Sequence, residues 1–151
     1  MLFCIDTDQF KTRTLSELVP SLTKNVLIDY CAATQQVVVG SAEGLVHVFD
    51  VKNTKCTPLH AHNAPTSAVS LATNGRTLVT FSENEGRVSI WQSSSGLLSL
   101  MSPGPLKLVR VVDALPPLSS NHSSKSPLFK WEATKLVSLY LSDGTKKSFA
   151  V

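Results

Sequence analysis

A phrase of eleven residues occurs twice in this chain, and the repeat constrains the fold more than any other feature. The copies are "SAEGLVHVFDV" at 41–51 and "SENEGRVSIWQ" at 82–92. Val38 corresponds to Val79 at an offset of 41, and Gly44 corresponds to Gly86 at an offset of 42. The second copy therefore has one extra residue, and that residue lies in the loop. An insertion confined to a loop leaves the side-chain alternation of the flanking strands unchanged.

Short β-strand patterns surround both copies and follow the same order. The expected strands are 25–32, 35–41, 45–51, 55–62, 67–73, 76–82 and 87–92. Asn74-Gly75 is a strong hairpin signal, and the proline in 55–62 is typical of an edge strand. No helical pattern of about 10–15 residues separates the strands, so a βαβ plan is disfavoured. Two units of about 40 residues match the period of β-propeller blades.

Composition and charge exclude several classes of protein. Of the 151 residues, 42% are hydrophobic, which permits a packed core, and the formal net charge is only +3. A nucleic-acid-binding domain usually has a denser stripe of Lys and Arg, so we expect no nucleic-acid partner. No apolar run reaches the length of a membrane span, which is roughly 18–20 residues. We therefore expect no membrane insertion.

The start of the chain and its cysteines indicate a cytoplasmic protein. "MLFCIDTDQF" has no basic segment before its apolar residues, so it does not match a signal peptide. Cys4, Cys31 and Cys56 are odd in number and form no CxxC pair. Neither a zinc site nor a disulfide framework is indicated.

Catalytic and metal-binding motifs are weak. Asp6 and Asp8 form a DxD pair, but nothing downstream completes a calcium loop. His60 and His62 offer two metal ligands without an evident third, so a structural role is favoured for His62. There is no GxSxG elbow and no phosphate-binding loop. We expect no catalytic residues, no metal and no cofactor, and so no enzyme.

The repeated phrase resembles a blade of the WD-repeat family. In that family a Gly-His pair enters the blade and a Trp-Asp pair ends its third strand; here Ala61-His62 and Trp91-Gln92 stand at these places. The resemblance implies a structural tetrad of hydrogen-bonded side chains. Its members would be His62, Ser82 (or Thr80), Glu85 and Trp91. A neutral imidazole can donate from one nitrogen and accept at the other, which suits a bridge between a hydroxyl and an acid.

The first copy departs further from the WD pattern. Phe49 stands for Trp, Glu43 for the turn Asp, and Ser21 where the His would fall. We expect this blade to be held by packing, with little or no tetrad. Gly44 and Gly86 fit turn positions that need positive φ.

The layout of residues 25–151 resembles the carboxyl-terminal end of the rabconnectin beta-chain family of large WD-repeat proteins. The residues that carry this resemblance are the "FSENEGRVSIWQSSSG" run at 81–96 and the ending "DGTKKSFAV". It implies a regulator of vacuolar-type proton ATPase assembly and of organelle or vesicle acidification. It also implies protein partners, namely a second large WD-repeat protein and proton-ATPase subunits. The expected location is cytoplasmic, or peripheral on organelle membranes.

The chain divides into five segments. They are an N-terminal segment (1–24), a first WD-like blade (25–64), a second blade with 106–115 as its outer strand (65–115), a Ser/Pro-rich loop (116–127) and terminal strands of a third blade (128–151). Residues 14–23 are either a helical turn stopped by Pro20 or the outer strand of a preceding blade. Asp143-Gly144 is a turn candidate in the last unit.

We expect an all-β chain that forms a partial β-propeller of about three WD40-type blades. Propellers close with about 4–8 blades, so the predicted fold is an incomplete one, as in a fragment of a larger propeller. A small protein that closes by self-association is the alternative.

One edge of the predicted blades carries the candidate interaction residues. The turns at 41–44 and 82–86 and the loop at 60–65 would share a rim, which would be locally acidic and could face a basic or mixed protein surface. Its candidate residues are Glu43, His60, Glu83 and Glu85. Two alternatives stay open, which are a scaffold subunit of another complex and a structural segment without direct partner contact.

Overall fold

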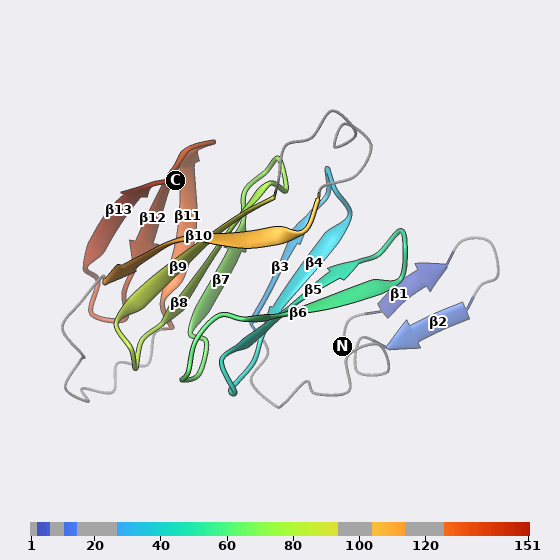
Figure 1. Ribbon diagram of the computed structural model, residues 1–151, viewed down its shortest axis with the longest axis horizontal. Coiled ribbons are helices and arrows are strands. Elements are labelled where there is room, and N and C mark those ends of the chain that lie inside the picture. The colour runs from blue at the N-terminus through green and yellow to red at the C-terminus, as the bar shows by residue number, and fades with distance from the viewer. Residues whose placement is uncertain (1–2, 7–10, 15–26, 94–103, 114–125) are drawn as a thin grey trace.

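The computed structural model describes residues 3–6, 11–14, 27–93, 104–113 and 126–151. Every regular element within these residues is a β-strand, and Figure 1 shows the strands as separate twisted sheets that stand side by side. The prediction of an all-β chain is confirmed.

The first sheet contains four antiparallel strands in sequence order. They are β3 (Leu27–Cys31), β4 (Gln36–Gly40), β5 (Leu45–Asp50) and β6 (Lys55–His60). All five residues of β4 are buried, as expected for a β-branched strand covered on both faces. β6 contains Pro58 and is the outermost strand, so its prediction as an edge strand is confirmed.

The second sheet repeats this plan with four antiparallel strands in sequence order. They are β7 (Ala68–Leu71), β8 (Thr77–Ser82), β9 (Arg87–Ser93) and β10 (Leu106–Asp113). Phe49 lies opposite Val37 in the first sheet, and Trp91 lies opposite Leu78 in the second. The two pairs are related by the same offsets as the repeated phrase, so the repeat predicted from the sequence is also a repeat of strand register.

A third sheet has three strands, and a hairpin precedes the first sheet. The third sheet comprises β11 (Leu128–Ala133), β12 (Leu136–Tyr140) and β13 (Lys146–Ala150) in that order. The hairpin pairs β1 (Phe3–Asp6) with β2 (Lys11–Thr14). The helical turn or outer strand predicted within 14–23 lies almost wholly outside the described residues, as does most of the loop 116–127.

Two apolar clusters hold the three large sheets together. The first lies between sheets one and two and includes Val38, Val46, Leu78 and Trp91. The second lies between sheets two and three. Its buried members are Ala68, Val79, Phe81, Val88, Ile90, Val137, Leu139, Leu141 and Phe149. Each fully buried aliphatic or aromatic side chain contributes about 1.5–3 kcal/mol to folding. The sheets therefore pack face to face like blades, because each presents an apolar face to its neighbour.

The innermost strands of the three sheets meet along one line, with β7 between β3 and β11 (Figure 1). Among the described residues the sheets form no closed ring, so the fold is a partial, propeller-like array. No helix in the described part of the chain is long and apolar enough to cross a membrane.

A polar network ties these innermost strands together. The Asp29 carboxylate on β3 accepts hydrogen bonds from the Ser70 hydroxyl at 2.8 Å and the Leu71 amide at 2.9 Å. The Trp131 indole on β11 donates to the same Ser70 hydroxyl at 3.1 Å. One serine thus links all three sheets through the Asp29–Ser70–Trp131 network.

Candidate functional site: the turn rim and the His62 hydrogen-bond chain

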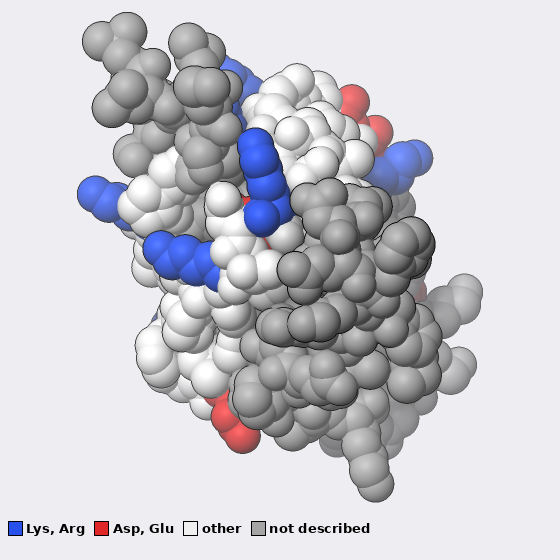
Figure 2. Space-filling view, turned by 90° about the vertical axis from the view of Figure 1, so that its right-hand side faces the viewer, with Lys and Arg blue, Asp and Glu red and all other residues white. Residues whose placement is uncertain are grey.

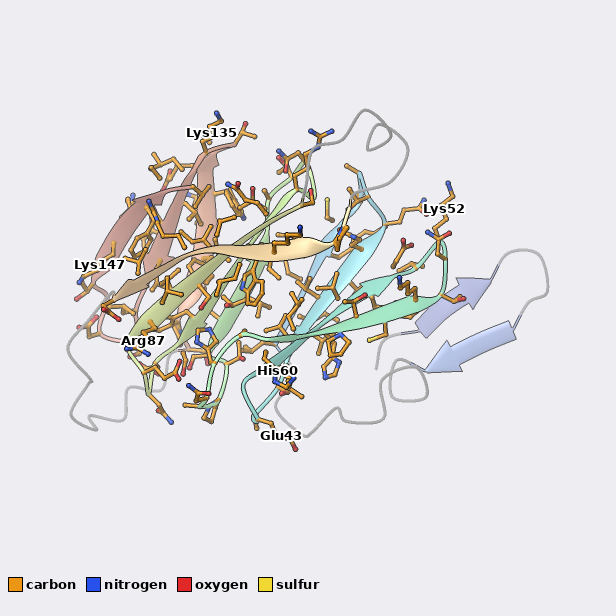
Figure 3. All side chains as sticks on the ribbon, viewed as in Figure 1. Glu43, Lys52, His60, Arg87, Lys135 and Lys147 are labelled. Atoms are coloured by element: carbon orange, nitrogen blue, oxygen red, sulfur yellow. The ribbon has the colours of Figure 1, made fainter. Side chains whose placement is uncertain are left out.

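One edge of the array is built from three β-turns and one loop, which we call the turn rim (residues 41–44, 61–67, 83–86 and 142–144). Glu43, His60 and Arg87 lie along this edge, at the bottom of Figure 3, whereas Lys52 and Lys135 lie toward the other end of the strands. The predicted rim is therefore formed by the predicted segments, and the third sheet extends it.

The three turns share a chemical signature, an acid followed by a glycine. The pairs are Glu43-Gly44, Glu85-Gly86 and Asp143-Gly144. The φ angles of these glycines are 80°, 64° and 88°, so the positive φ predicted for the first two is confirmed. The third pair was predicted only as a turn. The recurring acid-glycine dipeptide would have placed it on the rim.

Gly44 also allows the first turn to approach the neighbouring loop closely. Its carbonyl accepts the Ala61 and His62 amides at 3.2 and 3.1 Å. A Cβ at this position would stand 2.2 Å from the His62 carbonyl oxygen. The glycine is therefore required by sterics as well as by φ, and the first turn fixes the backbone that carries His62.

The His62 side chain joins the rim loop to the second sheet. Its Nδ1 lies 2.8 Å from Glu85 Oε2, and its Nε2 lies 3.0 Å from the Thr80 hydroxyl. The second Glu85 oxygen accepts the Asn63 amide at 2.9 Å. The imidazole is 1% exposed and the Glu85 side chain 15% exposed, so this hydrogen-bond chain is shielded from water.

Burial sets the protonation state of this chain. Burial lowers the pKa of His62 below its ordinary value, and the hydrogen bond and charge of Glu85 oppose this only partly. Burial by itself would raise the pKa of Glu85, but hydrogen bonds from the Asn63 amide and from His62 outweigh it, so the pKa of Glu85 is lowered. A neutral His62 therefore donates from Nδ1 to the Glu85 carboxylate and accepts the Thr80 hydroxyl proton at Nε2.

Two members of the predicted tetrad lie outside this chain, so that prediction is corrected. The Ser82 hydroxyl donates to the Pro65 carbonyl at 2.8 Å, and Thr80, the alternative hydroxyl, is the one that binds His62. Trp91 packs in the cluster between sheets one and two, and its buried indole N–H has no hydrogen-bond partner within the described residues. The polar contacts join three side chains, not four.

The strand register explains these differences. Leu78, Thr80 and Ser82 alternate along β8 and share one face. Trp91 lies opposite Leu78, which precedes Thr80 by two residues on β8. Ser82 follows Thr80 by two residues and lies beside the loop that contains Pro65. Thr80 is therefore the hydroxyl placed to meet His62.

The first sheet follows the expectation of packing without a tetrad. Phe49 is 2% exposed and clusters with Val37 and Val39. In the same sheet, His47 Nδ1 on β5 lies 3.8 Å from the Cys56 thiol on β6. Burial lowers the pKa of His47 and raises that of Cys56, which favours an uncharged pair. A thiol held in its uncharged form is a poor nucleophile.

The rim acids divide into two classes by their contacts. Glu85 is held by His62, and a Glu83 oxygen accepts the Ser142 hydroxyl at 2.9 Å, which joins the second and third sheets. Glu43 is exposed, and Asp143 is exposed with one oxygen bound to the Thr145 amide. Glu83 and Glu85 stabilise the rim, whereas Glu43 and Asp143 face the solvent.

The basic side chains on one flank of the molecule are dispersed. In Figure 2 the Lys and Arg side chains of one flank stand apart from one another on the described surface. His60 is exposed at the end of β6. The described residues contain no group of three His, Cys, Asp or Glu side chains arranged to hold a metal ion.

No family model matches the sequence. Among solved structures, the chain is similar to the crystal structure of the computationally designed protein Ika4, with a TM-score of 0.56 and 17% sequence identity. The match covers 82% of this chain and 64% of Ika4, so this chain corresponds to less than two thirds of that protein. At this identity the likeness concerns the fold alone.

Proposed function

We propose that this protein is a non-catalytic interaction scaffold that contacts protein partners through its turn rim. The observation that carries the proposal is the fixed geometry of the three acid-glycine turns. The Gly44 carbonyl binds the loop of the second sheet, and Ser142 binds Glu83 across sheets two and three. A rim held by such contacts presents its exposed groups without a large ordering cost on binding.

The partner surface is expected to be basic or mixed. Glu43 and Asp143 project from successive turns of the array and are exposed, so their charges can contact a partner. Opposite charges across an interface raise association rates and select partners. Glu83 and Glu85, which were predicted as contact residues, are assigned instead to support of the rim, because both accept hydrogen bonds from neighbouring segments.

The resemblance to WD-repeat proteins of the rabconnectin beta-chain family supports a finer proposal. On that basis the chain takes part in regulating the assembly of the vacuolar-type proton ATPase in the cytoplasm, at organelle or vesicle surfaces. Its partners would be a second large WD-repeat protein and proton-ATPase subunits. The blade-like sheets and the repeated turn phrase are compatible with this role.

Charge reversal tests the proposal. The variant Glu43→Lys/Asp143→Lys changes two exposed rim charges, and Lys52→Glu is the matched control at the other end of the strands. Affinity purification with quantitative mass spectrometry should show partners lost from the rim variant and retained by the control. If the rim variant keeps every partner of the unaltered chain, the rim is not the contact surface. Cross-links from Lys52, Lys55 or Lys107 to another subunit would then locate the true contact.

A further inference from the structure

A cleft of about 380 Å³ lies between the first sheet and the start of β10. All ten residues that line it belong to the described part of the chain. They come from β4, β5, the turn after β5, β6 and residues 104–106. Pockets for small ligands have volumes of roughly 300–1,000 Å³. The cleft is therefore large enough for one small molecule or one side chain.

The strand register divides the lining of the cleft into rows. Gln36 lies opposite Asp50, and Asp50 lies opposite Lys55, so these side chains form one polar row across β4, β5 and β6. Val48 lies opposite Thr57 in the next row. Side chains two residues apart on a strand share a face, so both rows face the cleft. We call the donors of Gln36, Lys55 and Thr57, together with Asp50, the polar end.

The rest of the cleft is mostly apolar. Val48 and Leu59 are buried members of the cluster between sheets one and two, and Leu106 packs against this cluster from β10 while remaining partly exposed. Pro105 lines the cleft beside Leu106. We call these side chains the apolar wall. An apolar group that displaces water from this wall would be held by the hydrophobic effect.

The polar end contains hydrogen-bond donors that no described residue uses. Gln36 is 8% exposed, and its Oε1 accepts the Thr34 hydroxyl at 3.2 Å, but its amide N–H groups have no acceptor within the described residues. In the same part of the chain, the Lys55 ammonium and the Thr57 hydroxyl also donate to no other residue. Largely buried amides are usually hydrogen-bonded. The polar end therefore fits a ligand that supplies acceptors.

The acid at the polar end is already hydrogen-bonded. Asp50 Oδ1 accepts the Asn53 backbone amide at 3.0 Å, and Oδ2 accepts the Asn53 side-chain amide at 2.7 Å. Lys55 stands opposite Asp50, yet the two form no ion pair among the described residues. The groups left without a partner are thus donors, and one of them is a cation. A carboxylate has the complementary charge and only acceptors.

We propose that this cleft binds a carboxylate joined to a branched apolar group. The carboxylate accepts hydrogen bonds from the unused donors of the polar end, and the apolar group covers the apolar wall. This chemistry occurs in small organic acids and at the carboxyl terminus of a protein chain that ends in an apolar residue. Lys52, next to the lining residue Asn53, lies away from the turn rim in Figure 3, so the proposal is independent of the proposed function.

Titrations followed by NMR of the isotope-labelled chain test the proposal, with the side-chain amide signal of Gln36 as the direct readout. The probe is isocaproate, which joins a carboxylate to a branched apolar group. Isocaproamide removes the charge, and acetate removes the apolar group. A short acetylated peptide that ends in leucine, with a free or an amidated carboxyl terminus, represents the end of a protein chain.

Isocaproate should shift the Gln36 amide signal more than isocaproamide or acetate at the same concentration, and should bind more weakly at higher salt. Lys55→Met should weaken binding by about two- to five-fold, the range of one exposed ion pair. Lys52→Met is the matched control, because Lys52 is exposed nearby but does not line the cleft. Thr57→Val keeps the branched shape without the hydroxyl and should weaken binding about two-fold or more.

The source of the ligand follows from the peptide. Tighter binding of the free-acid peptide than of isocaproate would assign the ligand to a protein chain end, and the reverse order would assign it to a small acid. Circular dichroism and urea unfolding establish that each variant is folded.

Several results would overturn the proposal. Equal binding of isocaproate and isocaproamide would remove the carboxylate from the explanation. Equal effects of Lys55→Met and Lys52→Met, or an unmoved Gln36 amide signal while other signals shift, would place the ligand outside the polar end. No binding of any probe would refute the proposal directly and leave a cleft that holds only water.

Discussion

Replacing Glu85 with Ala should destabilise the fold through the His62 hydrogen-bond chain. The substitution removes the acceptor of the His62 Nδ1 proton and of the Asn63 amide. The Asn63 amide can turn to water because that residue is exposed. The imidazole is 1% exposed, so its proton is left without a partner in a dry site. A hydrogen bond to a charged group contributes about 1.5–3 kcal/mol, and an unpaired buried donor costs about 1–3 kcal/mol. The two ranges estimate the same lost interaction and are not added together. We therefore expect the free energy of unfolding to decrease by about 2 kcal/mol.

Urea unfolding followed by the fluorescence of Trp91 and Trp131 measures this decrease. Asp143→Ala is the matched control, because the corresponding turn acid there is hydrogen-bonded to the exposed Thr145 and not to a buried side chain. Its effect should stay within about 0.5 kcal/mol. A double-mutant cycle between Glu85→Ala and His62→Ala should give a coupling of about 1 kcal/mol or more. Equal effects of Glu85→Ala and Asp143→Ala would refute the assignment of Glu85 as a structural acid.

Three further predictions concern acid pH, a glycine and the network between the sheets. Because folding lowers the pKa of His62, the stability that neutral His62 contributes is complete above pH 6.5 and is lost as the pH falls below 6.5. The urea midpoint should therefore fall as the pH is lowered below 6.5. An unchanged midpoint would contradict a neutral His62. Gly44→Ala should lower the free energy of unfolding by about 3 kcal/mol or more, because the added Cβ would meet backbone atoms. Gly144→Ala should lower it by about 1 kcal/mol, because the surroundings of Gly144 are open. Equal losses measured by urea unfolding would be inconsistent with the close approach at Gly44. Ser70→Ala should cost about 1–3 kcal/mol and shift the emission of Trp131, which loses its hydroxyl acceptor; an unchanged spectrum and midpoint would argue against the network.

The first two sheets could be predicted because the two copies of the repeated phrase align with each other on both sides of the loop. An offset that changes from 41 to 42 within a loop, with apolar alternation on both sides, is difficult to satisfy without paired strands. The pairs Phe49–Val37 and Trp91–Leu78 in the structure occupy equivalent positions under that alignment. The third sheet was predicted less fully because its turn, at Gly144, follows Gly86 by more than one period of the repeat.

The hydrogen-bond chain was predictable only in part. His62 and Glu85 could be paired before the structure because the resemblance to WD-repeat blades implies a tetrad at these positions. Thr80 and Ser82 have the same chemistry and the same face of β8, so alternation cannot distinguish them. The position of the Pro65 carbonyl decides between them, and that position depends on tertiary structure.

The Asp29–Ser70–Trp131 network carries no local sequence signal at all. Its members lie on three different sheets, far apart in the chain, and each looks ordinary within its own strand. The three residues meet only because the innermost strands of successive sheets lie side by side. Contacts of this kind depend on how the sheets stack against one another, whereas the sequence repeat predicts only how the strands pair within each sheet.

The same distinction separates support from contact on the rim. Acids whose side chains reach a neighbouring segment, such as Glu83 and Glu85, stabilise the relative placement of the sheets. Acids that stand at the equivalent point of a turn without such a neighbour, such as Glu43, contribute little to folding. Since charged side chains are mostly exposed in any protein, the sequence alone could not separate the two groups. It follows that Glu43→Lys should leave stability nearly unchanged while altering binding, whereas Glu83→Lys should alter both, because it removes the acceptor of the Ser142 hydroxyl.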